Sequence, residues 1–179
     1  MTRARWDVAR TLLMGVLLGL GAHACGTPAS DDRLTVHAPS SKSFATVGVM
    51  LDRRCGTLDC HGSHLRNFQL FGQSGMRFKA TDLPGALPTT LDELDQNYHS
   101  VVGLEPEVIT AVVRDQGARP DRLTLVRKAR GLEYHLGGAQ IVAGEDADVC
   151  ITSWLAGATD EAACTRATHA IDPLLDPTP

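Results

Sequence analysis

The chain has 179 residues, of which 43% are hydrophobic and 21% are charged, and its net charge is −4. It has no basic excess of the kind that nucleic-acid binding requires, so no nucleic-acid partner is expected. The length suits one domain with extended ends, and no repeat with a solenoid or propeller period is visible.

Residues 1–24 have the pattern of a secretory signal peptide. Arginines precede the uncharged stretch TLLMGVLLGLGA, which is shorter than the roughly 20 apolar residues of a membrane-spanning helix. The sequence Ala22-His23-Ala24-Cys25 fits a lipoprotein signal, in which Cys25 becomes the lipidated first residue, or an ordinary cleavage site. We expect the lipoprotein, held by its lipid in the bacterial cell envelope. Gly26 is unlike an acidic inner-membrane retention signal, which favours the outer membrane; the alternative is a periplasmic or secreted protein.

Three further segments follow the signal peptide. Residues 25–42 are rich in Pro, Ser and Asp and poor in large apolar residues, which predicts a flexible tether. Residues 43–166 form the predicted domain, and residues 167–179 are predicted as a flexible tail.

Within the domain, hydrophobic periodicity and stop signals predict short helices separated by long loops. Thr90 and Glu93 form a capping box at the start of one helix. Residues 108–113 fit either a strand or a helix, and residues 67–88 hold too many Gly, Pro and Thr for regular structure. The predicted helices span residues 43–54, 90–102, 120–131 and 146–156.

The domain holds four of the five cysteines, and two of them form the run CGTLDCHG. Cys55 and Cys60 are followed at once by His61. A c-type haem is attached by thioether bonds to two nearby cysteines, and the histidine after the second one is placed to bind the iron. The usual spacing has two intervening residues and this chain has four, which is a rarer variant of the motif.

The segment from Ser43 to Trp154 resembles the cytochrome c-like domains of exported bacterial lipoproteins. The resemblance implies an all-α fold, a small cytochrome c-like domain of short helices with long loops. It also implies one haem c, electron transfer with redox partner proteins, and His61 as the proximal iron ligand. The matching parts, in the order of the family, are RRCGTLDCHGSHLRNFQLFG, GMRF, NYHSVVG, RPDRLTLVRKARG and YHLGGAQIVAGEDADVCITSWL.

The resemblance also indicates the distal iron ligand. His135 lies in the loop before the predicted helix 146–156, where the family often places methionine, and Met76 is the alternative. His64 is too near His61 in sequence to reach the other face of a haem, and His99 is expected to face solvent. Two histidine ligands give a lower potential than histidine and methionine, which favours an electron carrier over an enzyme.

The cysteines also allow other interpretations. Cys55 and Cys60 are alternatively joined in a local disulfide, or they bind zinc with His61 and His64, although ligands so crowded rarely reach tetrahedral positions. The second pair, Cys150 and Cys164, is expected to form a disulfide. The alternative function is therefore a disulfide-stabilised surface lipoprotein without haem, acting as a binding or structural module.

Side chains near the motif have two possible places each. The cations could pair with the haem propionates or lie on a solvated surface. The aromatic residues could form the pocket wall or belong to the core. These candidates are Arg66, Arg77 and Lys79, and Phe68, Phe71 and Phe78.

Overall fold

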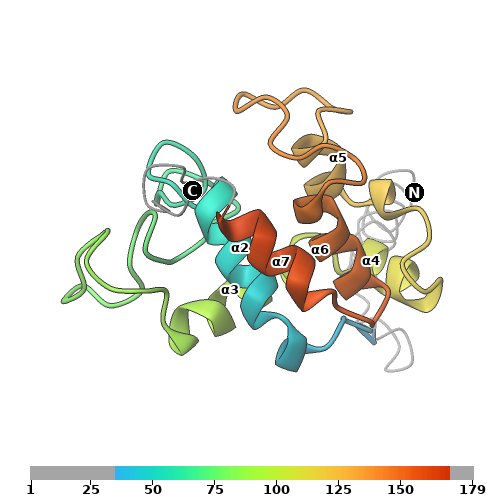
Figure 1. Ribbon diagram of the computed structural model, residues 1–179, viewed down its shortest axis with the longest axis horizontal. Coiled ribbons are helices and arrows are strands. Elements are labelled where there is room, and N and C mark those ends of the chain that lie inside the picture. Colours follow the sequence, from blue (N-terminus) through green and yellow to red (C-terminus); the bar gives the residue numbers. More distant parts are fainter. Residues whose placement is uncertain (1–34, 170–179) are drawn as a thin grey trace, which may run out of the picture. The chain divides into compact units, whose positions relative to one another are not determined.

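Helix α2 is central to the helical architecture of this chain. The computed structural model describes residues 35–169, so the predicted signal peptide and Cys25 lie outside it. Within that range there are six α-helices, two short 3-10 helices and no strand, which confirms the all-α prediction (Figure 1). The elements are η3 (Ser41–Ser43), α2 (Ala45–Cys55), α3 (Leu91–Leu104), α4 (Pro106–Arg114), η4 (Pro120–Arg122), α5 (Thr124–Ala129), α6 (Asp146–Leu155) and α7 (Glu161–His169).

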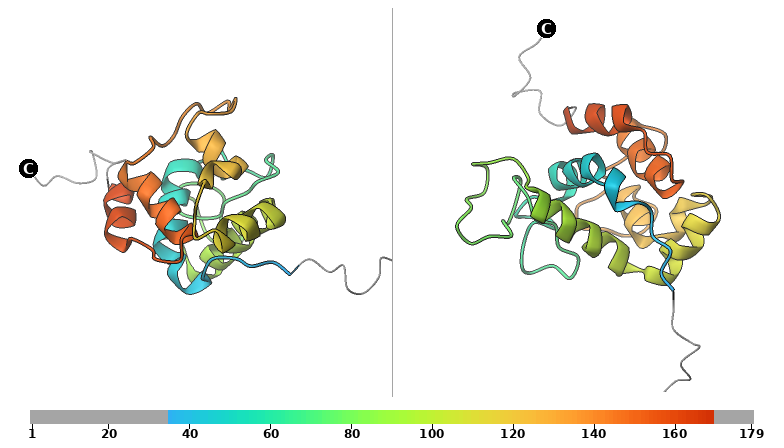
Figure 2. Two further views of the ribbon diagram at one scale, coloured as in Figure 1. Left: turned by 90° about the vertical axis from the view of Figure 1, so that its right-hand side faces the viewer. Right: turned by 90° about the horizontal axis from the view of Figure 1, so that it is seen from below.

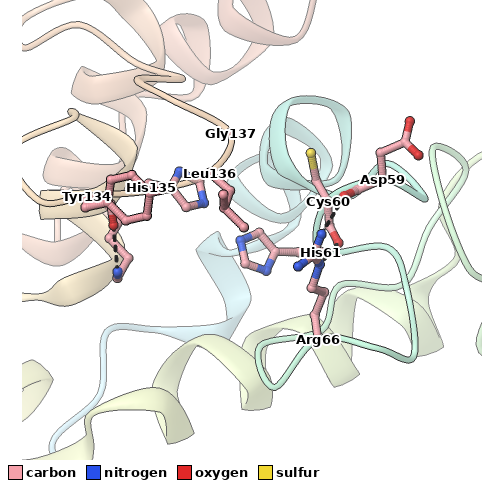
Figure 3. Close-up of a pocket in the computed structure, with 9 residues that line it drawn as sticks. Asp59, Cys60, His61, Arg66, Tyr134, His135, Leu136 and Gly137 are labelled. Atoms are coloured by element: carbon pink, nitrogen blue, oxygen red, sulfur yellow. Dashed lines mark hydrogen bonds between the residues drawn. The ribbon is translucent and has the colours of Figure 1, made fainter.

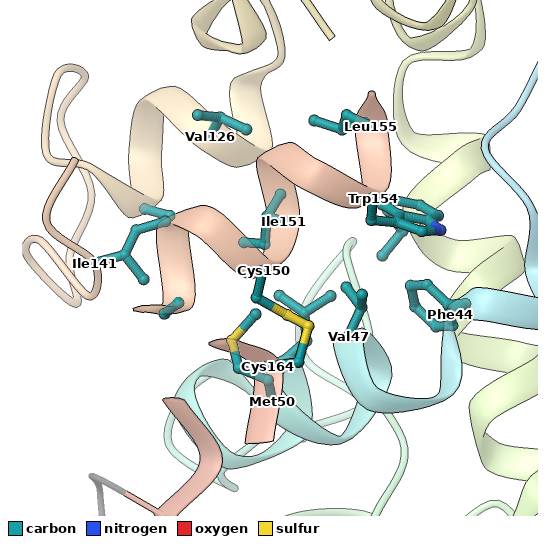
Figure 4. Packing of buried hydrophobic residues seen from close by; sticks show 14 of the residues in the cluster. Phe44, Val47, Met50, Val126, Ile141, Cys150, Ile151, Trp154, Leu155 and Cys164 are labelled. Carbon is teal, nitrogen blue, oxygen red and sulfur yellow. A yellow bond between two sulfur atoms is a disulfide. The ribbon is translucent and has the colours of Figure 1, made fainter. Parts of the chain in front are cut away.

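The hydrophobic core forms where α2 meets α6 and α7 (Figure 4). Val47, Met50 and Leu51 of α2 are buried, as are Ile151 and Trp154 of α6. Full burial of such a side chain contributes about 1.5–3 kcal/mol. In the right-hand view of Figure 2, α2 lies between α7 and α3, and it contacts both. None of the helices in residues 35–169 has the length and apolar character needed to cross a membrane.

A disulfide joins Cys150 in α6 to Cys164 in α7, as the sequence predicts. Both cysteines are fully buried within the core. The two helices that close the fold are therefore linked covalently at the place where they pack on α2.

Helix α7 is absent from the predicted helices. Asp160 begins it, because its Oδ1 accepts a hydrogen bond from the N–H of Ala163 at 2.9 Å. Its buried face consists of Ala163, Cys164 and Ala167, and no large apolar residue marks this face in the sequence. The predicted tail boundary is wrong for residues 167–169, which belong to α7, and residues 170–179 lie outside the described range.

The predicted tether is also wrong over its last residues. The hydroxyl of Tyr98 donates to the carbonyl of Pro39 at 2.9 Å, and Nε1 of Trp154 donates to the carbonyl of Ser40 at 3.0 Å. Buried aromatic side chains place their polar ends on a hydrogen-bond partner. These two bonds fix the chain to the domain before η3 begins.

Two further helix predictions are settled by the structure. The segment left open between strand and helix lies in α4, which Pro106 starts at its first position. The helix predicted over 120–131 is instead divided into η4 and α5, because Leu123 is extended and buried between them. The carboxylate of Glu105 accepts hydrogen bonds from the N–H and hydroxyl of Thr124, and so starts α5 anew.

The long connection between α2 and α3, residues 56–90, contains no helix and is held by buried polar side chains. The amide of Asn97 binds both the N–H and the carbonyl of Phe71 at 2.7 Å. The carboxylate of Asp52 accepts from the Ser74 N–H at 3.2 Å and the Thr89 hydroxyl at 2.6 Å. Buried polar groups are stable only when they are paired, so α2 and α3 order this connection through specific hydrogen bonds.

A buried ion pair holds the same connection at a third place. Arg77 donates to Glu93 at 2.7 and 3.0 Å, and the two side chains are only 2% and 1% exposed. Arg77 also donates to the carbonyls of Leu87 and Pro88. The expectation that Arg77 meets a haem propionate or faces solvent is therefore wrong.

Removal of the disulfide should destabilise the domain. Cys150→Ala together with Cys164→Ala should lower the free energy of unfolding by about 3 kcal/mol, since the unfolded chain regains the entropy of a closed loop. Urea unfolding followed by circular dichroism measures this change. Cys60→Ala is the control, because its thiol is in no disulfide, and an equal loss in that variant would contradict the assignment.

The buried ion pair should make stability depend on acid pH. Burial alone raises the pKa of Glu93, but hydrogen bonds from Arg77, Thr90 and Phe78 outweigh it and hold the pKa below its usual range. The stabilisation is therefore present above the ordinary glutamate pKa of about 4.3 and is lost as the pH falls below it. Glu93→Gln should cost about 3–5 kcal/mol at neutral pH, because Arg77 then stays buried without a counter-charge. Urea unfolding at neutral and acid pH should show a flatter pH dependence in this variant.

The neighbouring pair provides a matched control. Asp92 meets Lys79 at 2.7 Å, but these side chains are 57% and 58% exposed. Asp92→Asn should change the free energy of unfolding by less than about 1 kcal/mol. Equal losses for the two variants would show that burial of the Glu93 pair is not what matters.

Candidate functional site

The run CGTLDCHG forms a tight turn at the end of α2. The N–H of Cys60 and that of Gly62 both donate to the carbonyl of Thr57 at 2.9 Å. The N–H of His61 donates to the carbonyl of Cys55 at 2.8 Å. These bonds fold the four residues between the two cysteines into a turn, which brings His61 back to Cys55 at the end of α2.

Three glycines allow this turn to pack against the rest of the loop. A Cβ atom on Gly62 would lie 1.8 Å from the carbonyl oxygen of Gly56, and one on Gly75 would lie 2.0 Å from the same oxygen. Real Cβ atoms do not approach a carbonyl oxygen so closely. The backbones of Gly62 and Gly75 can therefore contact the backbone of Gly56 only because they carry no side chain. The glycine that follows His61 is therefore required by packing.

The imidazole of His61 is held in one orientation. Its Nδ1 lies 3.0 Å from the carbonyl oxygen of Phe68, and the centroids of the His61 and Phe68 rings are 4.9 Å apart in an edge-on arrangement. Burial lowers the pKa of His61, although the bond to Phe68 acts in the opposite direction. In the neutral ring Nδ1 must donate, because a carbonyl only accepts, and Nε2 keeps its lone pair.

The imidazole of His135 is also held by a backbone carbonyl. Its Nδ1 lies 3.1 Å from the carbonyl oxygen of Gly138, so in the neutral ring its Nε2 is also an acceptor. The ring centroids of His61 and His135 are 5.9 Å apart and the ring planes differ by 10° (Figure 3). Metal-binding histidines commonly donate their other ring N–H to a carbonyl in this manner.

Two adjoining cavities surround this histidine pair. The larger, of about 510 Å³, is lined by Cys60, and the smaller, of about 260 Å³, is lined by Cys55. Both lie within or near the range of ordinary small-molecule sites. The structure brings the sequence-predicted residues of the motif and the distal loop together at these cavities. The residues that line both are His61, Arg66, Lys128 and His135.

The walls of the two cavities include apolar side chains that nothing within residues 35–169 covers. Tyr134 and Leu136 line the larger cavity and are 81% and 80% exposed. Apolar surface left in water is unfavourable, so these side chains suit a large apolar occupant. In the smaller cavity the apolar lining includes Phe68, which was expected in the pocket wall or the core, together with Leu104, Leu125 and Ala129.

Cys55 and Cys60 are free thiols and are not joined to each other. Burial, followed by the neighbouring thiol of Cys60, raises the pKa of Cys55 to about 12. The thiolate is the form that attacks in disulfide exchange, so Cys55 reacts poorly. In residues 35–169 no three His, Cys, Asp or Glu side chains are grouped so that they could hold a metal ion. The cysteines and histidines of the zinc alternative are therefore not grouped as a zinc site.

The other candidate ligands lie away from the histidine pair. Met76 is buried and lines neither of the two cavities. His64 is exposed, and His99 is 68% exposed beside Asp95, as the sequence predicts for His99.

The predicted cations separate into two groups. Arg66 donates to the carbonyls of Asp59 and Cys60 at 2.9 and 3.2 Å and faces the cavities, whereas Lys79 lies at the surface on Asp92. Sequence reasoning missed Lys128, whose amino group donates to the carbonyl of Tyr134 at 3.0 Å. Two features of the sequence could have indicated that Lys128 lines the site: it lies one helical turn after Thr124, and it comes shortly before the His135 loop.

Comparisons with protein families, with curated proteins and with solved structures found no match to this chain. The case for function therefore depends on the geometry of the site.

The glycine contact should be essential to the turn. Gly62→Ala should distort the turn at Cys60 and His61 and lower the free energy of unfolding, because its Cβ meets the Gly56 carbonyl. Gly103→Ala is the control: a Cβ there meets no atom within 4 Å, and alanine in a helix is favoured by about 0.5–1 kcal/mol. Urea unfolding compares the two, and similar stability would contradict the close packing.

The two free thiols should differ in reactivity. With iodoacetamide at pH 8, Cys60 should be alkylated well before Cys55, because the thiolate of Cys55 is scarce at its pKa of about 12. Peptide mass spectrometry on the haem-free protein assigns each rate. Unfolding in urea should make the rates similar, and equal rates in the folded protein would show that Cys55 is not protected.

Proposed function

We propose that this chain is a mono-haem c-type cytochrome-like lipoprotein that transfers electrons at the bacterial cell envelope. One observation carries the proposal: the imidazoles of His61 and His135 lie parallel with centroids 5.9 Å apart, each with Nδ1 on a carbonyl, at cavities that Cys55 and Cys60 also line. The cytochrome c-like form of the helical fold is part of the proposal.

The residues at the site fit a haem c in donor chemistry and in cavity character. Cys55 and Cys60 would hold the group through thioether bonds, His61 would be the proximal ligand and His135 the distal ligand. When bound, the haem would supply an iron that takes up and gives back one electron. The chain's own contribution is to orient the two Nε2 lone pairs, and to exclude water with the apolar walls.

Cations at the cavities complete the fit. Arg66 and Lys128 line both spaces. Arg66 would pair with a carboxylate of a haem, and Lys128 would do so beside Glu133, which it meets at 3.0 Å. Arg66 is already oriented by its bonds to the backbone of the motif. Two histidine ligands would occupy both remaining positions of a bound haem iron, which favours an electron carrier over an enzyme.

The cell-envelope location depends on the predicted signal peptide and on lipidation of Cys25. Both lie outside the described residues. Attachment of haem to cysteines and the oxidised pair Cys150–Cys164 both suit an exported protein. We propose the outer membrane as the anchoring site and redox proteins as partners.

Spectroscopy of the full chain tests the proposal. After expression with haem-maturation machinery, a reduced-minus-oxidised spectrum should show sharp α and β bands, and denaturing gels should keep a haem-staining band. Cys60→Ser should weaken or abolish that band. No bands in the native protein would instead favour the disulfide-stabilised binding module without haem.

The distal ligand has its own test. His135→Ala should convert a low-spin spectrum into a high-spin one, because it removes one of two strong-field ligands while the covalent haem stays. Met76→Ala is the matched control and should leave the spectrum low-spin. The reverse result would assign the distal position to Met76.

A further inference from the structure

Arg54 joins the end of α2 to the loop that carries His135. It immediately precedes Cys55 in α2, and its Nη1 donates to the carbonyl of Gln140 at 2.9 Å and to Oε1 of Glu145 at 2.9 Å. The side chain of Arg54 is 14% exposed and that of Glu145 is 33% exposed. A largely buried charge-assisted contact of this kind is stronger than an exposed ion pair.

Glu145 extends this contact to the backbone of the His135 loop. The same Oε1 accepts from the N–H of Val142 at 2.9 Å. Arg54 and Glu145 therefore hold the loop at Gln140 and Val142, five and seven residues after His135. Gln140 and Cys55, the neighbours of this contact, both line the smaller cavity.

The rest of the loop is attached mainly to α5, where Lys128 donates to the carbonyl of Tyr134 at 3.0 Å and both Arg127 and Lys128 pair with Glu133. It is the orange segment between α5 and α6 in Figure 1, and Tyr134, Leu136 and Val142 are largely exposed. Its first buried apolar side chain after α5 is Ile141. The N–H groups of Gln140 and Ile141 both bind the carbonyl of Ala129 in α5, which ties the loop to α5 but not to the motif. Loops with little buried apolar surface open most readily.

We propose that Arg54 is a positioning residue that holds the His135 loop against the end of α2, so that the imidazole of His135 stays opposite that of His61. This inference rests on the proposed function for its consequence at the iron. Arg54 lines neither cavity, so it acts through Gln140 and Glu145. Its loss should loosen the loop at Gln140 and Val142, and with it the place of His135, while the motif on α2 stays folded.

The first test measures the loop in the haem-free protein. Arg54→Met should raise the hydrogen-exchange rates of the amides of Gln140 and Val142 by about tenfold, the factor that corresponds to roughly 1.4 kcal/mol. Arg54→Lys, which keeps a charge for Glu145, should restore part of the protection. Unchanged exchange in Arg54→Met would overturn the proposal whether or not the protein binds haem.

The second test measures ligation in the haem-loaded protein. Arg54→Met should keep its covalent haem, become partly high-spin, and bind added imidazole about ten times faster than the native protein. A purely low-spin spectrum with native imidazole kinetics would overturn the proposal. Absence of covalent haem in the native protein would reject the proposed function alone, and the exchange experiment then decides the role of Arg54.

Arg53→Met is the matched control. It removes the same charge from the adjacent residue of α2, but Arg53 donates to Oε1 of Gln73 in the other loop, at 2.6 Å. This variant should keep native hydrogen exchange at Gln140 and a low-spin spectrum. The same changes in both variants would point to a general loss of charge and would overturn the specific role of Arg54.

Discussion

Burial of α2 against α6 and α7 is the constraint on which the site depends. The apolar face of α2 fixes the helix axis, and the helix continues to Cys55 without a break. Consequently the motif begins at a point set by the core and not by a mobile loop. Side chains near the end of α2 then reach outward in different directions: Asp52 to the long connection and Arg54 to the His135 loop.

Polar side chains organise what the core does not reach. Asp52, Asn97 and Glu93 each hold a part of residues 56–90 by hydrogen bonds, and all three are buried. A long connection without helices normally needs something to pack against. Here it is anchored to α2 and α3 by the chain itself, which leaves the apolar faces of the two cavities available for an occupant. The proposed haem would therefore fill a space that the rest of the fold already defines.

Local signals in the sequence predicted the parts of the fold that depend on local chemistry. The capping box of Thr90 and Glu93 is present at the start of α3, and the pairing of Cys150 with Cys164 is confirmed. Helix α7 was missed because its buried face is made of small residues. The break at Leu123 was missed because Glu105, far along the chain, provides the hydrogen bonds that restart the helix.

The candidate site likewise contains residues that a local motif indicates and residues whose partners lie far away in the sequence. The proposed roles of Cys55, Cys60 and His61 come from the spacing of one motif and that of His135 from the order of the elements. The structure brings these side chains to the two adjoining cavities. Arg77 in its buried pair and Arg54 in its contact with Gln140 have no such signal, because their partners are 10 or more residues away. A charged residue in sequence gives no indication of which distant carbonyl or carboxylate it will meet.

The four cysteines of the domain are of two kinds, a buried disulfide and two free thiols. An oxidising compartment can join any two accessible thiols. In this fold α6 and α7 bring Cys150 and Cys164 together inside the core, while Cys55 sits at a helix end where its proton is held tightly. The fold therefore separates the two pairs: Cys150 and Cys164 are joined inside the core, whereas Cys55 and Cys60 stay free thiols at the two cavities.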